Sequence, residues 1–306
     1  MKILLINPSF TGLYGNYAPA AKVGVLWPPM GLAYLASNIT GNHEVKILDL
    51  EVEPNLKKTL NNFNPDVVGV TFATPLFNQA MNLFRKIKKF NPKIWTVAGG
   101  PHSTTLPQSV ISNPFVDTVL IGEGEVAFNK FLKKPRKGIL KREALITDLD
   151  KIKFPARELL KNKKYLWSVP KKGIRPMTSF MTSRGCPFMC TFCSQHILFG
   201  RKMRYRSIGN IMEELTLIKD KYKINHLSML DDTLGLDKKR TFELCDNIRK
   251  EKLDITFEGY TRVNVITEEL LRKLKKAGLN RLSFGVESGD QNILNATKKG
   301  TNLKQI

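Results

Sequence analysis

Short apolar runs alternate with longer segments of helical periodicity over the first 130 residues. Apolar residues repeat at helical spacing, which predicts helices over 30–39, 56–63 and 76–90. The apolar runs predict five strands, at 2–6, 45–48, 67–72, 94–98 and 118–121. A loop rich in glycine and proline separates the first strand from the first helix. Apolar strands that alternate with helices are typical of a parallel sheet covered on both faces. We therefore predict a doubly wound, Rossmann-like α/β domain over 1–132.

The second half of the chain repeats the alternation of strand and helix. Apolar runs predict strands at 178–183, 226–230, 255–260 and 281–286. Helical periodicity predicts helices at 208–222, 239–250 and 268–277. Successive βα units of this kind form a barrel, in which functional groups belong at the carboxyl ends of the strands. We predict an incomplete (β/α) barrel over 177–306.

Polar and glycine residues gather where the strands of the first domain end. Ligands of open parallel sheets bind beyond that edge, and paired glycines let a backbone approach a ligand closely. No G-x-G-x-x-G follows the first strand, which disfavours a dinucleotide site. Tight turns alone would explain any one of these loops, but four on one edge favour a binding face. The candidate residues there are Asn7, Thr71, Thr74, Gly99, Gly100 and Glu123.

Three of the four cysteines stand within eight positions, as Cys186-x₃-Cys190-x₂-Cys193. This spacing suggests a metal centre rather than disulfides. A closed zinc site needs a fourth ligand, which His196 could supply. An iron–sulfur cluster held by three cysteines leaves one iron open for a substrate or cosubstrate. Cys245 falls in a helical segment and is expected to be a buried apolar residue.

The predicted strands of the second half also end in polar residues. Asp231 and Asp232 follow the second strand, Arg262 follows the third, and Glu287 follows the fourth. An acidic pair at such a place can simply cap a helix. The coincidence of polar residues at several strand ends favours a site.

The cysteine motif, on a loop after the first barrel strand, resembles that of the radical S-adenosylmethionine (SAM) superfamily. Taken whole, the chain resembles the subgroup that carries an amino-terminal cobalamin-binding domain. Further marks of the resemblance are the Asn-Pro after the first strand, the segment 27–36, the Gly-Gly-Pro-His at 99–102 and the Gly-Glu-Gly-Glu at 122–125.

The resemblance implies that Cys186, Cys190 and Cys193 hold a [4Fe–4S] cluster whose open iron binds SAM. One electron would then cleave the sulfonium and give a 5′-deoxyadenosyl radical. Phe192 matches the aromatic position that packs near adenine. Asp231 and Asp232 stand where the family contacts the methionyl amine, although the usual Gly-Gly-Glu is absent. The last two positions, expected near the carboxylate or ribose of SAM, are Arg262 and Glu287.

The resemblance also implies cobalamin. Many cobalamin domains carry Asp-x-His-x-x-Gly, but none of the four histidines (43, 102, 196 and 226) lies in such a motif. We therefore expect cobalamin without a histidine lower ligand. Gly99 and Gly100 would admit its nucleotide tail, and the threonines after the third strand would line the pocket.

Barrels of this superfamily usually have six βα units, and the sequence predicts four strands. We therefore expect either a truncated chain or a barrel that a partner completes. Four strands alone would expose two parallel edges.

The chain carries a formal net charge of +22, and half of that excess lies in residues 131–180. This stretch has scattered prolines and weak periodicity, which predict a basic connector over 133–176 with solvated lysines such as Lys161, Lys171 and Lys172. A surface for nucleic acid or anionic lipid is the alternative, but the stretch lacks the interleaved aromatic residues of a stacking platform.

We predict a cytoplasmic, cobalamin-dependent radical SAM enzyme that methylates an unactivated carbon. The expected partners are a small-molecule or lipid-like substrate and an electron donor such as flavodoxin or ferredoxin. A radical cyclase or oxidoreductase acting on a lipid, tetrapyrrole or secondary metabolite fits the same residues. Other possibilities are an RNA-binding or RNA-modifying protein and an inactive cofactor-binding remnant. No signal peptide or apolar run long enough for a membrane span is present in the sequence.

Overall fold

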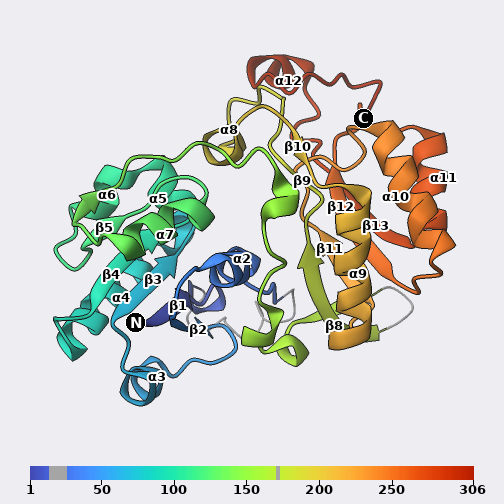
Figure 1. Ribbon diagram of the computed structural model, residues 1–306. Helices are drawn as coiled ribbons and strands as arrows, with labels where there is room; N and C mark the ends of the chain where they lie inside the picture. Colours follow the sequence, from blue (N-terminus) through green and yellow to red (C-terminus); the bar gives the residue numbers. More distant parts are fainter. Residues whose placement is uncertain (14–25, 170–172) are drawn as a thin grey trace. The chain divides into compact units, whose positions relative to one another are not determined.

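A computed structural model describes residues 1–13, 26–169 and 173–306 (Figure 1). The described chain forms two compact units. The first contains 1–146 and 152–164, and the second contains 147–151 and 165–306. Most of the predicted loop after the first strand, and Lys171 and Lys172 of the predicted connector, lie outside the described residues. The domain boundaries at 132 and 177 stay predictions.

The first unit is built on a parallel sheet with strand order β2-β1-β3-β4-β5-β6. The order reverses between β1 and β3, which is the kind of switch point where ligands bind in open α/β sheets. Its strands are β1 (Lys2–Asn7), β2 (Glu44–Asp49), β3 (Val67–Thr71), β4 (Trp95–Gly99), β5 (Thr118–Val119) and β6 (Gly138–Ile139).

Helices cover both faces of this sheet because its strands are apolar on both sides (Figure 1). Three helices share one apolar core with alternate strand residues: α3 (Leu56–Phe63), α4 (Phe77–Phe90) and α6 (Pro107–Ile111). On the other face α2 (Met30–Asn38) packs beside α7 (Gly124–Lys133). The short α5 (Pro101–Thr105) directly follows β4.

The predicted fold class of the first unit is confirmed, with three corrections. The sheet has six strands instead of five, because Gly138–Ile139 adds to β5. Helix α4 begins at Phe77, one residue late, because 74–76 form a 3₁₀ turn that contains Pro75. The sequence reading also missed α7, and it missed α5 and α6, which are short, begin with proline and so show little periodicity.

The second unit holds a five-stranded sheet with the order β13-β12-β11-β8-β7. The four parallel strands that the sequence predicts are all present, shifted by up to five residues at their starts. Strand β7 pairs antiparallel with β8 and covers an edge that we expected to be exposed. The strands are β7 (Leu166–Val169), β8 (Gly173–Phe180), β11 (His226–Met229), β12 (Thr256–Thr261) and β13 (Leu279–Phe284), with a small pair β9 (Ser183–Arg184) and β10 (Arg204–Tyr205).

Side chains of the two edge strands of this sheet come into contact, as in a sheet that begins to close into a barrel. Strands β7 and β13 are its two edges, so a flat sheet would separate them by about 19 Å. The Arg281 guanidinium of β13 nevertheless lies 5.0 Å from the ring centre of Trp167 on β7. Apolar residues of the outer face pack under α9 (Ile208–Tyr222), α10 (Lys238–Lys250) and α11 (Glu268–Lys276) (Figure 1). Two short helices, α8 (Gln195–Phe199) and α12 (Gln291–Ala296), complete the unit.

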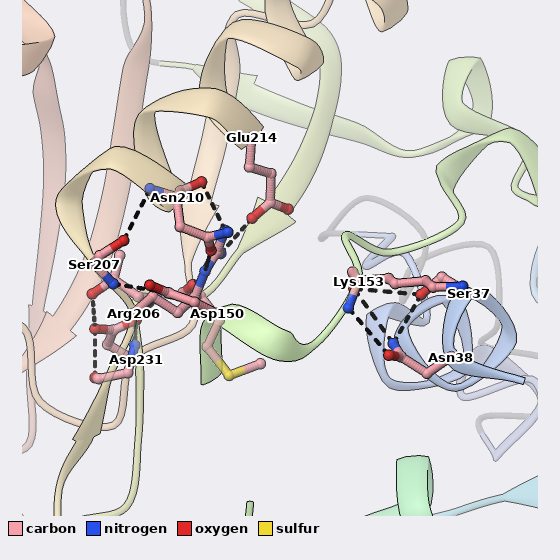
Figure 2. A network of polar contacts seen from close by, with 12 residues as sticks. Ser37, Asn38, Asp150, Lys153, Arg206, Ser207, Asn210, Glu214 and Asp231 are labelled. Atoms are coloured by element: carbon pink, nitrogen blue, oxygen red, sulfur yellow. Dashed lines mark hydrogen bonds and ion pairs between the residues drawn. The ribbon is translucent and has the colours of Figure 1, made fainter. Parts of the chain in front are cut away.

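The chain between 147 and 164 contributes to both units through 3₁₀ turns at Leu149–Lys151, Arg157–Leu159 and Asn162–Lys164. In the second unit, Asp150 accepts a hydrogen bond from the Ser207 backbone N–H at 2.9 Å (Figure 2). In the first unit, the Lys153 backbone N–H donates to Asn38 Oδ1 at 3.1 Å (Figure 2). Within the described ranges, no helix is long and apolar enough to cross a membrane.

A glycine between α11 and β13 tests the packing of the second unit. Gly278 has a φ of +111°, and a Cβ there would clash with the Ile255 carbonyl oxygen. We expect Gly278→Ala to destabilise this unit by roughly 2 kcal/mol or more, from backbone strain and the clash together. A lower midpoint of urea unfolding, followed by circular dichroism, measures the effect.

Gly209→Ala is the matched control, because Gly209 lies in α9 and a Cβ there meets nothing within 4 Å. Alanine in a helix is more favourable than glycine by up to about 1 kcal/mol. The control should therefore leave the midpoint unchanged or raise it. Equal midpoints for the Gly278 variant and the wild type would contradict the described packing.

Candidate cofactor sites

The end of β4 offers open space for a ligand in the first unit. A Cβ on Gly99 would meet nothing within 4 Å. The next residue, Gly100, has a φ of +88°, and a Cβ there would collide with the Thr71 hydroxyl at the end of β3. Gly100 therefore brings two strand ends into close contact, whereas Gly99 borders a space that a larger side chain would fill.

His102 of α5 makes side-chain hydrogen bonds at this edge of the sheet. Its Nδ1 lies 3.0 Å from Thr74 Oγ1, and its Nε2 lies 3.3 Å from Ser109 Oγ. The ring is buried against Phe72 and Phe77, and burial lowers the pKa of His102. Because both ring nitrogens contact hydroxyl groups, this histidine links Thr74 to Ser109.

Two other candidates of the first unit also make internal hydrogen bonds. The Asn7 amide donates to Asp49 Oδ1 at 3.0 Å, which ties the end of β1 to the end of β2. The Glu123 carboxylate accepts from the Ile146 backbone N–H at 2.8 Å. Ser103, which the sequence reading missed, is completely buried, and its hydroxyl has no hydrogen-bond partner among the described residues.

In the second unit, the three clustered cysteines lie on the loop 185–203, here called the cysteine loop. Its base is closed by the antiparallel pair of β9 and β10. Gly185 opens the loop with a φ of +100°, and a Cβ there would lie 2.5 Å from the Lys202 carbonyl oxygen. The Cys186 backbone N–H then donates to the Gly200 carbonyl at 3.3 Å. Glycine at 185 thus lets the two ends of the loop lie against each other.

All four cysteines are free thiols, and their surroundings differ. Cys190 is buried, Cys186 and Cys193 are half-buried, and Phe192 beside them is 54% exposed. Among residues 1–13, 26–169 and 173–306, no three Cys, His, Asp or Glu side chains converge into a ready-made metal site. Cys245 is buried in α10 as predicted, and burial raises the pKa of its thiol to about 12.

The carboxylate of Asp231, just after β11, makes hydrogen bonds that stabilise the fold. Its carboxylate accepts hydrogen bonds from the backbone N–H groups and the hydroxyls of Thr182 and Ser183. Thr182 follows β8 and Ser183 begins β9, so the two residues link β8 to the cysteine loop. Arg240 of α10 donates to the Thr182 hydroxyl at 3.1 Å and to the Thr182 carbonyl at 3.0 Å. The carboxylate of Asp231 therefore fixes the point from which the cysteine loop departs.

A buried ion pair supports the same segment (Figure 2). Arg206 follows β10 and donates to the Glu214 carboxylate of α9 and to the Met181 carbonyl. It also donates to Asn210 Oδ1 at 2.7 Å. Both charged side chains are almost completely buried, so removing either partner would leave an uncompensated charge.

The carboxylate of Asp232, the neighbour of Asp231, has fewer hydrogen-bond partners. The Gln195 amide of α8 donates to its Oδ1, while Oδ2 is buried with no partner in the described part of the chain. Burial raises the pKa of Asp232 to about 6; the Gln195 hydrogen bond opposes this shift and the Asp231 charge adds to it. An unpartnered carboxylate oxygen at a strand end can accept a donor from a ligand.

Arg262 and Glu287 approach the cysteine loop from the ends of β12 and β13. Arg262 Nη1 donates to Cys190 Sγ at 3.1 Å. Glu287 has a φ of +70°, which is rare for a residue with a side chain, and pairs with Lys299 at 2.9 Å. Lys299 Nζ in turn lies 5.9 Å from the ring centre of Phe192.

The structure thus brings the candidates of the second unit around one loop. Arg262 contacts Cys190, and Glu287 reaches Phe192 through Lys299. Asp231 binds the residues before the loop, and Asp232 binds Gln195 within it. The sequence reading missed Gln195 and Lys299, whose residue types carried no signal of their own. It also missed Thr233, whose hydroxyl lies 3.9 Å from Cys186 Sγ.

Comparison with known proteins agrees with the division of the chain into two units. Residues 18–132 match the model of the B12 binding domain, and residues 180–306 match that of the radical SAM superfamily.

Relatives align along the whole chain. An uncharacterized methyltransferase of Pyrococcus horikoshii is 36% identical over 100% of the chain and 69% of its own length. An anaerobic magnesium-protoporphyrin IX monomethyl ester cyclase of Rubrivivax gelatinosus is 27% identical over 100% of the chain and 59% of its own length.

Two solved structures share the fold. The cobalamin-dependent SAM radical enzyme OxsB superposes with a TM-score of 0.72 and 19% identity, over 99% of this chain and 46% of its own. The radical SAM methyltransferase TsrM from Kitasatospora setae gives 0.71 and 17%, over 98% of this chain and 64% of its own. The chain therefore spans between about half and two thirds of these proteins.

The family predicted from the cysteine motif is thus confirmed by both halves of the chain and by a relative similar along its full length. The protein belongs to the radical S-adenosylmethionine proteins that carry a B12-binding domain.

Proposed function

We propose that this protein is a cobalamin-dependent radical SAM enzyme that transfers a methyl group to an unactivated carbon. The observation that carries the proposal is the cysteine loop, where three free thiols stand beside polar side chains from the ends of three parallel strands. Active sites of barrel enzymes lie at this end of the strands. The cobalamin half of the proposal rests on the B12-binding match over 18–132.

The donor chemistry of the loop fits an iron–sulfur cluster. Three thiols on one loop suit a [4Fe–4S] centre, since soft thiolate ligands select iron–sulfur clusters and leave one iron for SAM. When bound, the cluster supplies the electron that cleaves SAM. The chain holds the loop through Asp231, Arg206 and Arg240 and keeps Cys190 buried.

Asp232 is the best candidate for the SAM amine. Its unpartnered oxygen is a buried acceptor beside the cysteine loop, and Gln195 orients the other oxygen. The exposed ring of Phe192 offers a face for the adenine. Lys299 holds Glu287 in its strained conformation next to that ring, where the carboxylate can meet a ribose. Asp232, Phe192 and Glu287 are thus proposed to contact the groups of SAM that the family resemblance implies for them.

The first unit fits a corrinoid. The space at Gly99 is open to a ligand, because a Cβ there would meet nothing within 4 Å, and the adjoining Gly100 lies against the Thr71 hydroxyl. His102 is held by Thr74 and Ser109, so we propose binding without a histidine on the cobalt. Asn7 and Glu123 act by fixing strand ends rather than by contact with the cofactor.

The proposed substrate is a small or lipid-like molecule, and a flavodoxin or ferredoxin is the proposed electron donor. Ring formation is the second candidate, because one relative is a magnesium-protoporphyrin IX monomethyl ester cyclase. Product analysis separates the two. Methyl transfer yields S-adenosylhomocysteine alongside 5′-deoxyadenosine, whereas ring formation yields only the latter.

Replacing any of Cys186, Cys190 or Cys193 by alanine should abolish the cluster and the formation of 5′-deoxyadenosine. Each variant would be reconstituted anaerobically, and its iron, sulfide and visible absorbance would be compared with the wild type. Cys245→Ala is the control, since Cys245 is buried in α10, and it should keep a full cluster. A full cluster in Cys190→Ala would refute the proposed ligand set.

Asp232→Asn should weaken SAM binding and remove its dependence on pH. In the wild type, the carboxyl has a raised pKa of about 6, so affinity for the cationic amine should fall as the pH drops through 6. The same shift means that the folded state disfavours the ionised form above pH 6. The variant should therefore unfold at a higher urea concentration at pH 8, with a gain of at most about 3 kcal/mol that fades as the pH falls from 6 towards 4.

Asp246→Asn is the control for Asp232→Asn. Asp246 is half exposed and pairs with Lys273 at 2.5 Å. Loss of such a pair should change stability by under about 1 kcal/mol and leave SAM binding intact. Titration of reconstituted protein with SAM, read by isothermal calorimetry at pH 5.5 and 8, gives the affinities. Unchanged affinity in Asp232→Asn would remove Asp232 from the site.

Gly99→Ala should weaken cobalamin binding without loss of stability. The added methyl group enters open space, so it should obstruct a ligand rather than the fold. Retention of hydroxocobalamin on a desalting column, quantified by corrin absorbance, measures binding. Gly209→Ala in α9 is the control and should retain as much cobalamin as the wild type. Equal retention by Gly99→Ala would argue against this space as the corrinoid site.

A further inference from the structure

Arg262 follows β12, and its guanidinium is directed at the cysteine loop. Nη1 donates to Cys190 Sγ at 3.1 Å, and only 5% of Arg262 and 8% of Cys190 are exposed. We propose that this hydrogen bond tunes the reduction potential of the cluster, with Arg262 acting as a positioning and tuning residue through Cys190. The inference rests on the proposed function, because it concerns the cluster that the three cysteines would hold.

The guanidinium is fixed from several sides. Its Cζ lies 3.8 Å from the ring centre of Phe188, which belongs to the cysteine loop. Nε lies 3.4 Å from Asn264 Oδ1, and the Asn264 amide donates to the Gly300 carbonyl at 3.2 Å. The guanidinium of Arg262 is therefore packed on several sides. This packing fixes the geometry of its hydrogen bond to Cys190.

The charge of Arg262 differs from that of two other buried cations near the loop. Lys299 is neutralised by Glu287 at 2.9 Å, and Arg206 is neutralised by Glu214. In the part of the chain that the structure describes, no carboxylate pairs with Arg262, and its buried Nη2 has no hydrogen-bond partner. The positive charge of Arg262 thus acts mainly on Cys190.

A hydrogen bond from a cation to a cysteine ligand favours the reduced cluster. Reduction adds negative charge, part of which lies on the sulfur, so the bond strengthens when the electron arrives. Burial strengthens the effect because the local dielectric is lower than that of water. Arginine stays charged at every accessible pH, so the effect does not switch off. Arg262 should therefore raise the potential of the cluster and ease its reduction.

The test measures the potential of the reconstituted full chain without SAM. Wild type, Arg262→Lys, Arg262→Gln and Arg281→Gln would be titrated anaerobically with a low-potential chemical reductant and followed by electron paramagnetic resonance. Arg281 is the matched control, because its guanidinium stacks on Trp167. We expect a more negative potential for Arg262→Gln, a smaller shift for Arg262→Lys, which keeps the charge, and no shift for Arg281→Gln. All four proteins should hold equal iron and sulfide.

Several results would overturn the inference. One is a wild-type potential in Arg262→Gln with a full cluster. Another is weaker SAM binding without a shift in potential, which would make Arg262 a cosubstrate contact instead. Loss of the cluster in both Arg262 variants, but not in Arg281→Gln, would assign Arg262 to loop assembly. If the wild type itself forms no cluster, the proposed function fails first, and this inference fails with it.

Discussion

The buried carboxylate of Asp231 is the interaction on which the second site depends. It binds four donors of Thr182 and Ser183 and so joins the end of β11 to the residues that follow β8. The cysteine loop departs from these residues, and β9 with β10 closes its base. A loop of this length would otherwise be free to spread. One satisfied carboxylate, with Arg240 and Arg206 behind it, fixes where the three thiols start.

Two adjacent aspartates, both just after the end of β11, have opposite surroundings because their side chains face different elements. The side chain of Asp231 faces the neighbouring strand end and is saturated by its donors. That of Asp232 faces α8, where Gln195 satisfies one oxygen and leaves the other buried without a partner. The ionised form of the second residue is disfavoured, which raises its pKa to about 6. The fold thus tolerates an unfavourable charge beside the loop, and such a charge is useful to a cationic ligand.

Periodicity in the sequence was sufficient for the long elements and the order of the two units, because their apolar faces had to be buried. It failed at two short strands whose few residues show no pattern of their own, β6, which pairs with β5, and β7, which pairs antiparallel with the next strand, β8. For the candidate site, too, local patterns in the sequence revealed some residues but not their contacts. Spacing alone made the three cysteines candidates, and their places at strand ends made Arg262 and Glu287 candidates. The contact of Arg262 with Cys190 spans 72 residues, and no local pattern encodes it.

Buried polar atoms without partners help to separate binding residues from supporting ones, provided that their place in the fold is considered. Asp232 Oδ2, Arg262 Nη2 and Ser103 Oγ are unpartnered among the described residues and lie just beyond strand ends. Glu258 is also buried with unpartnered oxygens, and burial raises the pKa of its carboxyl. It lies within β12, however, in register with Ser228 on one side and Arg281 on the other. Its neighbours can satisfy it by rotation of their own side chains, whereas Asp232 and Arg262 follow strand ends and contact the cysteine loop, so only there does an unpartnered atom mark a candidate binding residue.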